Sequence, residues 1–233
     1  MAIISYKQAM ERIAKVIARA GVCSRRQAER LIEQGRVTVN GAAITSPALN
    51  VSSTDSITVN GNPLPAAEAT KLWMHYKPSG LVTTHHDPEG RPTVFDTLPK
   101  DLPDHIMSVG RLDQYSEGLL LLTNDGDLAR KLEHPSSGIE RVYRVKIKGD
   151  ISQAQLDALY PKVTIDGVTY SNVKAKKRGA WIQITLVEGK NREIRNIISH
   201  LEAKVVKLIR LSYGPYQLKD LKPGEIVEVK ITS

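Results

Sequence analysis

The sequence contains a single cysteine, Cys23, among its 233 residues. One thiol excludes a disulfide within the chain and any zinc site built from several cysteines, and it is typical of a reducing compartment. No segment approaches the roughly 18 consecutive apolar residues that a membrane helix needs. The first residues, MAIISYKQAM, lack the basic start and long apolar stretch of a secretion signal. We therefore expect a cytoplasmic protein that does not interact with membranes.

Motifs for common ligands are also missing. The chain has no GxxxxGK[ST] loop, the pattern that cradles nucleotide phosphates. Its six histidines include the adjacent pair His85 and His86, but no partner ligands stand at a metal-binding spacing. We expect neither a metal nor a cofactor, and we interpret the histidine pair as part of a polar loop.

Positive charge is unevenly distributed along the chain, whose formal net charge is +8. Residues 1–61 hold 8 Lys and Arg against 4 Asp and Glu, so about a quarter of the length carries half of the excess. An ordinary solvated surface is one interpretation of such charge. Clustering in so small a segment favours contact with the phosphates of a polyanion.

The same N-terminal segment predicts two short helices followed by a few short strands. Four apolar residues within residues 12–20 recur at helical spacing: Ile13, Val16, Ile17 and Ala20. Ser24 can cap a second helix together with Gln27, three residues later, and Gly35 suits the position just after its end. Strand-like segments then end in Asn40-Gly41 and Asn60-Gly61, which are typical of hairpin turns.

The stretch ARAGVCSRRQAERLIEQGRVTVNG resembles the S4 RNA-binding domain, and the resemblance extends over residues 12–61. It implies that residues 1–61 form a small α/β domain that binds structured RNA. The basic residues implied as RNA contacts are Arg12, Lys15, Arg19, Arg25, Arg26, Arg30 and Arg36.

The remainder of the chain predicts a linker and a second, larger domain. Residues 62–70, NPLPAAEAT, carry two prolines and no apolar pattern, so we expect a linker. Strand-like segments dominate residues 71–233: LWMHYKP, VYRVKIKG, VTYSNVKAK, WIQITLVEG and AKVVKLIRLSYGP. SQAQLDAL and NREIRNIISHL are helical, the first with Ser152 and Gln155 as a capping box. This mixture predicts an α+β domain with a mixed, largely antiparallel sheet and flanking helices.

One carboxylate stands out in GRLDQYSEGLLLLTNDGD, residues 110–127. The plain interpretation makes Asp113 a turn residue, LLLL a buried strand and TNDGD a tight turn. A chemical interpretation is also open. Hydrolysis of a glycosidic bond usually takes two carboxylates. An isomerase that breaks and remakes such a bond needs one carboxylate, a neighbouring cation that favours its charged form, and an aromatic face for the detached base.

The stretch GRLDQYSEGLLLLTNDG resembles the central motif of RNA pseudouridine synthases, in the branch that modifies ribosomal RNA and often carries an S4 domain. The segments YKPSGLVTTHHDPEGRPTVFDTLP, ERVYRVKIKG, EGKNREIRNI and VVKLIRLSYGP also match, in the family's order. The resemblance covers nearly all of residues 12–227. It implies cofactor-free conversion of uridine to pseudouridine in ribosomal RNA, and DPEGRPTVFDTLP favours large-subunit over small-subunit RNA.

The resemblance also implies roles for individual residues. Asp113 matches the essential aspartate, Tyr143 the tyrosine that stacks on the flipped uracil, and Arg195 the arginine that pairs with the aspartate. Arg111 matches a residue that helps displace the target nucleotide, and Leu208 matches a pocket-lining leucine. The sequence departs from the common pattern of arginine, glutamine and arginine at three positions: Lys190, Glu193 and Asn196.

The expected partner is ribosomal RNA or a pre-ribosomal particle, bound by a monomer. Three alternatives remain open at this stage. The first is an enzyme that modifies small-subunit RNA. The second is a non-catalytic RNA-binding assembly factor that retains the pocket, and the third is a hydrolase of N-glycosidic bonds. The hydrolase requires a second carboxylate, for which Glu117 is the nearby candidate.

Overall fold

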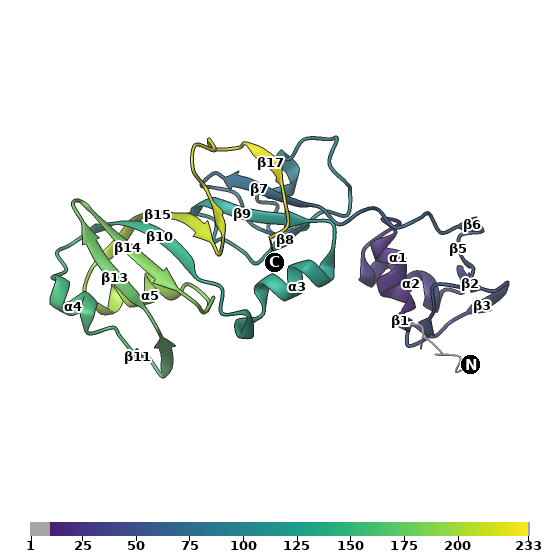
Figure 1. Ribbon diagram of the computed structural model, residues 1–233, viewed down its shortest axis with the longest axis horizontal. Coiled ribbons are helices and arrows are strands. Elements are labelled where there is room, and N and C mark those ends of the chain that lie inside the picture. The colour runs from purple at the N-terminus through teal and green to yellow at the C-terminus, as the bar shows by residue number, and fades with distance from the viewer. Residues whose placement is uncertain (1–9, 233) are drawn as a thin grey trace, which may run out of the picture. The chain divides into compact units, whose positions relative to one another are not determined.

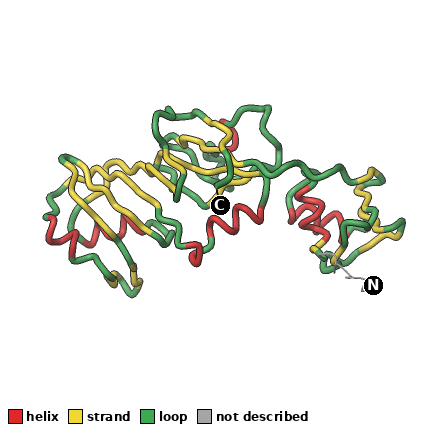
Figure 2. The backbone as a smooth tube through the Cα atoms, in the orientation of Figure 1, coloured by secondary structure: helices red, strands yellow, loops and turns green. Residues whose placement is uncertain are grey.

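The computed structural model describes residues 10–232 and divides into two units. Unit 1 extends to Thr70 and includes Pro103–Ile106, and unit 2 comprises Lys71–Leu102 and the chain from Met107 onward. Each unit combines helices with its own sheet (Figures 1 and 2). No helix within the described range has both the length and the apolar character to cross a membrane. Residues 1–9, which belong to the stretch expected to carry no secretion signal, lie outside the described residues.

Unit 1 packs two helices, α1 (Ile13–Arg19) and α2 (Arg25–Glu33), against short strands. Four strands form one sheet in the order β3-β2-β5-β6, and β1 pairs separately with β4. The strands are β1 (Glu11–Arg12), β2 (Val37–Val39), β3 (Ala42–Ile44), β4 (Asn50–Val51), β5 (Ile57–Val59) and β6 (Asn62–Pro63). The buried core consists of Ile13, Ala14, Ile17, Ala28, Ile32, Val37, Val51, Ile57 and Val59.

Local sequence signals explain where α2 begins and ends. The hydroxyl of Ser24 accepts a hydrogen bond from the Gln27 N–H, and the Gln27 side chain accepts one from the Ser24 N–H, which is the predicted capping box. After the helix, Gly35 adopts a φ of +68° and the Arg36 N–H donates to the carbonyl of Leu31. This closure of the last turn favours glycine at the left-handed position.

Two hairpins complete the sheet of unit 1. Asn40-Gly41 joins β2 to β3 and Asn60-Gly61 joins β5 to β6, and all four residues have positive φ. Such turns match the right-handed twist of the strands they connect. The second hairpin makes Asn62 and Pro63 part of the sheet, whereas residues 64–70 contain no helix or strand.

Unit 2 is built on a nine-stranded sheet with the order β13-β14-β10-β15-β9-β7-β17, with β16 beside β15 and β8 beside β9. Its strands are β7 (Leu72–Lys77), β8 (Met107–Val109), β9 (Glu117–Thr123), β10 (Arg141–Lys148), β13 (Lys174–Arg178), β14 (Trp181–Leu186), β15 (Lys204–Tyr213), β16 (Tyr216–Gln217) and β17 (Ile226–Val229). β15 pairs with β9 in parallel, and the other pairings described in this sheet are antiparallel. The predicted α+β class and the mixed, largely antiparallel sheet are confirmed.

Three helices accompany this sheet: α3 (Gly126–Glu133), α4 (Gln153–Asp157) and α5 (Glu193–His200). A separate hairpin is formed by β11 (Lys162–Ile165) and β12 (Val168–Ser171), and single 3-10 turns occur at η1 (Phe95–Thr97) and η2 (Pro135–Ser137). The predicted capping box of Ser152 and Gln155 begins α4. α3 replaces the tight turn predicted for TNDGD. The side chain of Asp125 accepts hydrogen bonds from two N–H groups in the following turn and so starts a helix there.

β9 lies in the interior of the sheet and is buried along its whole length. Its four leucines, Leu119 to Leu122, are 0% exposed, as predicted for a buried strand. Gly118 precedes them with a φ of +102°, opposite Arg210 of β15. A Cβ atom built on Gly118 lies 2.4 Å from the Arg210 carbonyl oxygen. The close approach of β15 to β9 therefore requires glycine at this position.

We expect Gly118→Ala to destabilise unit 2 by more than about 2 kcal/mol, because the new methyl group meets backbone atoms that cannot move independently. Urea unfolding followed by tryptophan fluorescence measures this loss. Both tryptophans of the chain, Trp73 and Trp181, lie in unit 2.

Gly179→Ala is the matched control, because Gly179 also has a positive φ of +60° but a Cβ atom there meets nothing within 4 Å. This variant carries only the backbone cost of about 1–2 kcal/mol. Equal losses in the two variants would show that the approach of the two strands places no steric demand on Gly118.

Candidate active site

Asp113 lies in the loop of residues 110–116, which joins β8 to β9. The Thr83 hydroxyl donates a hydrogen bond to the Leu112 carbonyl at 2.8 Å and accepts one from the Leu112 N–H at 3.3 Å. On the other side of the aspartate, the Ser116 N–H donates to the Asp113 carbonyl at 3.0 Å. The backbone is therefore held immediately before and after the carboxylate.

A buried cation supports this loop from within the sheet. Lys77, at the end of β7, is 0% exposed and its Nζ donates to the carbonyls of Pro78, Gln114 and Ser116 at 3.0, 3.3 and 2.9 Å. Burial lowers the pKa of Lys77 to about 8, and attraction to Asp113 and Glu117 opposes part of that decrease. Three backbone carbonyls compensate for the lost hydration, so the ammonium group fixes the shape of the loop.

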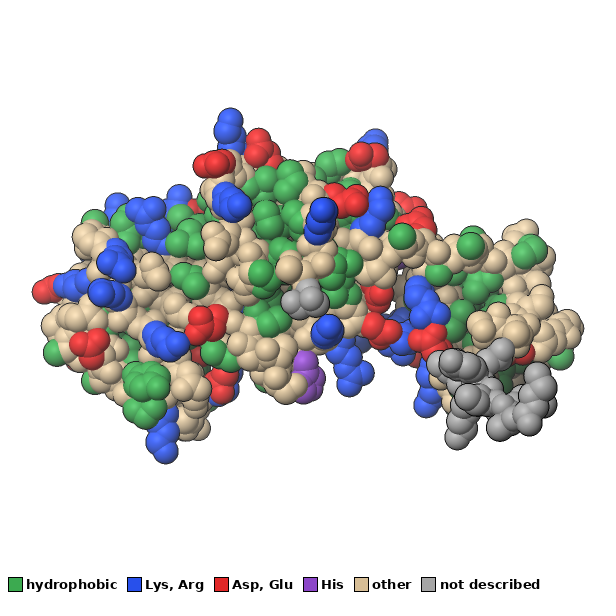
Figure 3. All heavy atoms as spheres, viewed as in Figure 1, with side chains coloured by type: hydrophobic (Ala, Val, Ile, Leu, Met, Phe, Trp, Pro, Cys, Tyr) green, Lys and Arg blue, Asp and Glu red, His purple; other side chains and the backbone are tan. Residues whose placement is uncertain are grey.

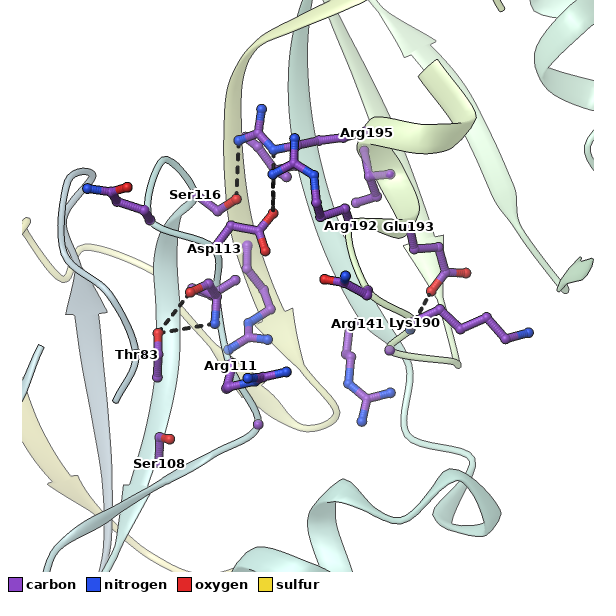
Figure 4. A pocket seen from close by; sticks show the side chains of 18 of the residues that line it. Thr83, Ser108, Arg111, Asp113, Ser116, Arg141, Lys190, Arg192, Glu193 and Arg195 are labelled. Atoms are coloured by element: carbon purple, nitrogen blue, oxygen red, sulfur yellow. Dashed lines mark hydrogen bonds and ion pairs between the residues drawn. The ribbon is translucent and has the colours of Figure 1, made fainter. Parts of the chain in front are cut away.

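The Asp113 carboxylate faces two guanidinium groups at the start of α5 (Figure 4). Its Oδ2 lies 3.5 Å from Nε of Arg195 and 3.9 Å from Nη1 of Arg192. Both are ion-pair distances, and Nε of Arg195 forms no hydrogen bond among the described residues. Nη2 of Arg195 also donates to the Tyr115 carbonyl at 3.1 Å and to the Ser116 hydroxyl at 3.4 Å. Arg195 thus connects α5 to the loop as well as to the carboxylate.

The loop forms one wall of a cavity of about 870 Å³, and β10, α5 and β15 contribute to the other (Figure 4). All five pocket residues expected from the sequence line it: Arg111, Asp113, Tyr143, Arg195 and Leu208. Tyr143 and Leu208 are largely buried, with 9% and 5% exposure, whereas Arg111 is exposed. The cavity therefore combines apolar and aromatic surface with Asp113, several further carboxylates and several cations.

Four further arginines line the cavity that the sequence did not single out: Arg91, Arg141, Arg192 and Arg210. Arg141 donates to the Tyr213 hydroxyl at 2.7 Å, and Nε of Arg210 donates to the Leu119 carbonyl at 2.6 Å. Each arginine belongs to a segment that carried the resemblance. The directions of the Arg141 and Arg210 side chains, however, depend on strand register, and that of Arg192 depends on how α5 begins.

Glu193, in the first turn of α5, is buried at 4% exposure on the wall opposite Asp113. Its Oε2 accepts a hydrogen bond from the Lys190 N–H at 3.1 Å, and its buried Oε1 has no hydrogen-bond partner among the described residues. Burial raises the pKa of Glu193 to about 7, while the hydrogen bond from Lys190 and the charge of Arg141 act in the opposite direction. A carboxyl group that retains its proton resembles the glutamine that is common at this position.

We expect the stability difference between Glu193→Gln and the native protein to depend on pH. Between the ordinary pKa of 4.5 and about 7, the native state binds the Glu193 proton more tightly than the unfolded chain does. The contribution of Glu193 to the free energy of unfolding therefore falls as pH rises through this window. At pH 8 the variant should be the more stable protein, by on the order of 2 kcal/mol, and near pH 4.5 this advantage should vanish.

Urea unfolding at pH 4.5 and pH 8, followed by tryptophan fluorescence, measures both differences. A stability difference that is the same at both pH values would contradict the raised pKa of Glu193.

The loop before the site contains the two adjacent histidines. The ring of His85 stacks on Phe95 with centroids 3.6 Å apart, and His86 lines the cavity. Within residues 10–232 no group of three or more His, Cys, Asp or Glu side chains is arranged to hold a metal ion.

The basic residues of unit 1 fall into two groups. Exposed arginines on and beside the two helices are Arg12, Arg25, Arg26, Arg30 and Arg36. Lys15 and Arg19 are half-buried and form ion pairs with Glu11 of β1, whose pKa these pairs lower. The exposed group has its guanidiniums in contact with solvent, whereas Lys15 and Arg19 are already paired with a carboxylate.

Comparison with protein families identifies both parts of the chain. Residues 71–201 match the family described as RNA pseudouridylate synthase, and residues 11–63 match the S4 domain. The first match contains the loop with Asp113, the strand with Tyr143 and the helix with Arg195. The S4 match shows an RNA-binding domain, and the expected RNA partner follows from the two matches together.

Individual relatives extend over nearly the whole chain. An "Uncharacterized RNA pseudouridine synthase" of Rickettsia felis is 48% identical over 225 residues, which cover 94% of this chain and 97% of the relative. "Ribosomal large subunit pseudouridine synthase B" of Bacillus subtilis is 39% identical over 227 residues and covers 94% and 92%. A solved structure, "Crystal structure of pseudouridylate synthase", aligns with a TM-score of 0.69 and 27% identity over 94% of this chain and 96% of that one. This chain belongs to the RNA pseudouridylate synthase family.

Proposed function

We propose that this enzyme converts one or more uridines of large-subunit ribosomal RNA to pseudouridine, with Asp113 as the catalytic carboxylate and without a cofactor. The relative from Bacillus subtilis, whose name specifies the large ribosomal subunit, supports the choice of substrate. The observation that carries the proposal is the ion pair of Asp113 with Arg195 in a cavity that Tyr143 also lines. We further propose that a monomer acts in the cytoplasm on ribosomal RNA or on a pre-ribosomal particle.

The cavity supplies what an everted uridine needs. Stacking of a base on an aromatic ring is worth about 1–3 kcal/mol, which offsets much of the few kcal/mol lost when the base leaves its stack. Tyr143 provides the ring, Leu208 adds apolar surface, and exposed Arg111 can occupy the place that the base leaves. The base is thereby held inside the cavity while its bond to the sugar is broken.

The chemistry requires that the base be retained and turned. The N1–C1′ bond breaks, the uracil rotates and C5 joins C1′. C5 then loses its proton and N1 takes up a proton, so the product is an isomer of the substrate. Asp113 takes part either by attacking C1′, by attacking the uracil ring, or by assisting elimination to a glycal. In each route its carboxylate must face the sugar and base, and the guanidiniums of Arg192 and Arg195 restrict it to the cavity side of the loop.

The alternative of a glycosidic hydrolase loses the second carboxylate that the sequence suggested for it. Glu117, the second carboxylate considered for it, forms an ion pair with Lys207 at 2.7 Å and does not line the cavity. A non-catalytic assembly factor would bind ribosomal RNA through the same domains without turnover. Activity measurements separate these possibilities.

We expect Asp113→Asn to abolish pseudouridine formation while RNA affinity stays within a few fold of the native value. The amide keeps the size of the carboxylate but lacks its charge and nucleophilicity. Tritium release from ribosomal RNA labelled at uridine C5 measures turnover, and filter binding measures affinity.

Asp101→Asn, which makes the same chemical change at an exposed position outside the cavity, should behave as the native protein does. Substantial tritium release by Asp113→Asn would remove that residue from the reaction. Binding without release by the native protein would indicate an assembly factor, and free uracil with an abasic site would indicate a hydrolase.

We expect the double variant Arg26→Ala and Arg30→Ala to bind ribosomal RNA more weakly and with a smaller salt dependence. Two lost phosphate contacts should reduce the slope of log K against log[salt] by about 2. Lys222→Ala with Lys230→Ala is the control, because both lysines are exposed in unit 2 outside the cavity. An unchanged slope in the arginine variant would exclude this face of unit 1 from the RNA interface.

A further inference from the structure

The sheet of unit 2 has a second charged surface, on the side facing away from the cavity. Successive residues of a strand point to opposite faces of a sheet. On β10, Tyr143 and Val145 are buried, and Tyr143 lines the cavity. The alternate residues of the same strand, Arg144 and Lys146, are exposed. The alternation therefore directs Arg144 and Lys146 away from the cavity.

Basic residues continue across this outer surface on the neighbouring strands. Register pairs place Lys176 beside Gln183 and Gln183 beside Arg144, and they place Lys146 beside Lys207. We use "basic face" for the exposed cations on this side of β10, β13 and β15: Arg144, Lys146, Lys148, Lys174, Lys176, Arg178, Lys204 and Lys207. With adjacent strands about 4.8 Å apart, the distance from β13 across β14 and β10 to β15 is about 14 Å, and three of these four strands carry cations.

The basic face lies on the side of the sheet away from α5. α5 borders the cavity through Ile194 and Arg195, so it lies on the opposite side of the sheet. Lys and Arg side chains gather over the part of unit 2 where β10, β13 and β14 lie (Figure 3). All eight residues of the basic face are exposed.

Carboxylates neutralise little of this charge. Lys174 pairs with Glu140 at 2.9 Å and Lys207 pairs with Glu117 at 2.7 Å. For the other six cations, no carboxylate of the described residues lies within 4 Å, and the Arg144 guanidinium instead stacks over the Trp181 ring at 4.1 Å.

Like charges directly opposite each other on adjacent strands destabilise a sheet. Lys148 faces Lys204 with no carboxylate of the described residues within 4 Å of either, and Lys146 faces Lys207, whose charge Glu117 offsets. An anionic ligand that lies across these strands would remove this repulsion. Phosphates of an RNA backbone fit a broad, nearly flat array of cations, because each phosphate carries one negative charge and recurs at a regular spacing.

We propose that the basic face binds the phosphodiester backbone of a second segment of the folded RNA substrate, distinct from the segment that delivers the uridine to the cavity. This inference rests on the proposed function and deepens it. The sheet separates the two surfaces, so the RNA must fold around its edge to contact both. The enzyme then distinguishes a multi-helix RNA from an isolated stem-loop.

The test compares two RNA substrates. One is a full-length transcript of large-subunit ribosomal RNA, and the other is a short stem-loop cut from it around the pseudouridine that the native enzyme introduces. The variant is Lys146→Gln, Lys148→Gln and Lys176→Gln, which removes three charges without an ion pair. Lys100→Gln, Lys222→Gln and Lys230→Gln remove three exposed charges of unit 2 away from the basic face and from the cavity.

We expect the basic-face variant to lose about tenfold in kcat/KM on the transcript, and the slope of log K against log[salt] to fall by two to three. On the stem-loop its kcat/KM should stay within twofold of the native value. The control triple variant should match the native enzyme on both substrates, and replacing the three basic-face lysines by arginine should preserve native behaviour on the transcript.

Two results would overturn the inference: no loss on the transcript, which would leave the basic face to a partner other than RNA, or equal losses on both substrates. If the proposed function itself is wrong, the result differs: the native enzyme would form no pseudouridine in either RNA. Filter binding of the transcript would still measure the contribution of the basic face in that case.

Discussion

The site depends on the pairing of one carboxylate with guanidinium groups from a different part of the chain. Asp113 comes from the loop between β8 and β9, Arg195 comes from the first turn of α5, and Arg192 immediately precedes that helix. A carboxylate on a loop is otherwise free to turn toward water. The arginines hold it at the cavity wall, and Arg195 also binds the loop backbone at Tyr115, so the charge pair and the loop conformation stabilise each other.

The sheet determines whether this pair can form. Asp113 precedes β9, and Arg195 lies on the helix that leads into β15, the strand that runs parallel to β9. Gly118 allows these two strands to approach closely, and Lys77 holds three carbonyls of the chain around the aspartate. The position of the catalytic loop relative to α5 is thus a consequence of strand packing, as is the separation of the cavity from the basic face on the other side of the sheet.

Much of the fold follows from local signals in the sequence. The capping box at Ser24, the Asn-Gly hairpins and the four leucines of β9 each specify their structure through interactions within a few residues or through plain burial. α3 was harder to predict because Asp125 suits both a turn and a helix cap. The cluster of Asp113, Tyr143 and Arg195 was expected only from resemblance, since their proximity depends on contacts between distant segments. Resemblance did not indicate Arg141 and Arg210 as cavity residues, because their side chains point into the cavity only through the register of β10 and β15.

The most direct test is a structure of this enzyme with the ribosomal RNA stem-loop it modifies, in which an unreactive analogue replaces the target uridine. The central claim predicts that the analogue leaves the RNA stack and lies on the Tyr143 ring, with its sugar C1′ or its ring within about 3.5 Å of the Asp113 carboxylate, a distance that permits reaction. An analogue that remains stacked in the RNA, or that occupies the cavity with Asp113 turned away from both sugar and base, would contradict it.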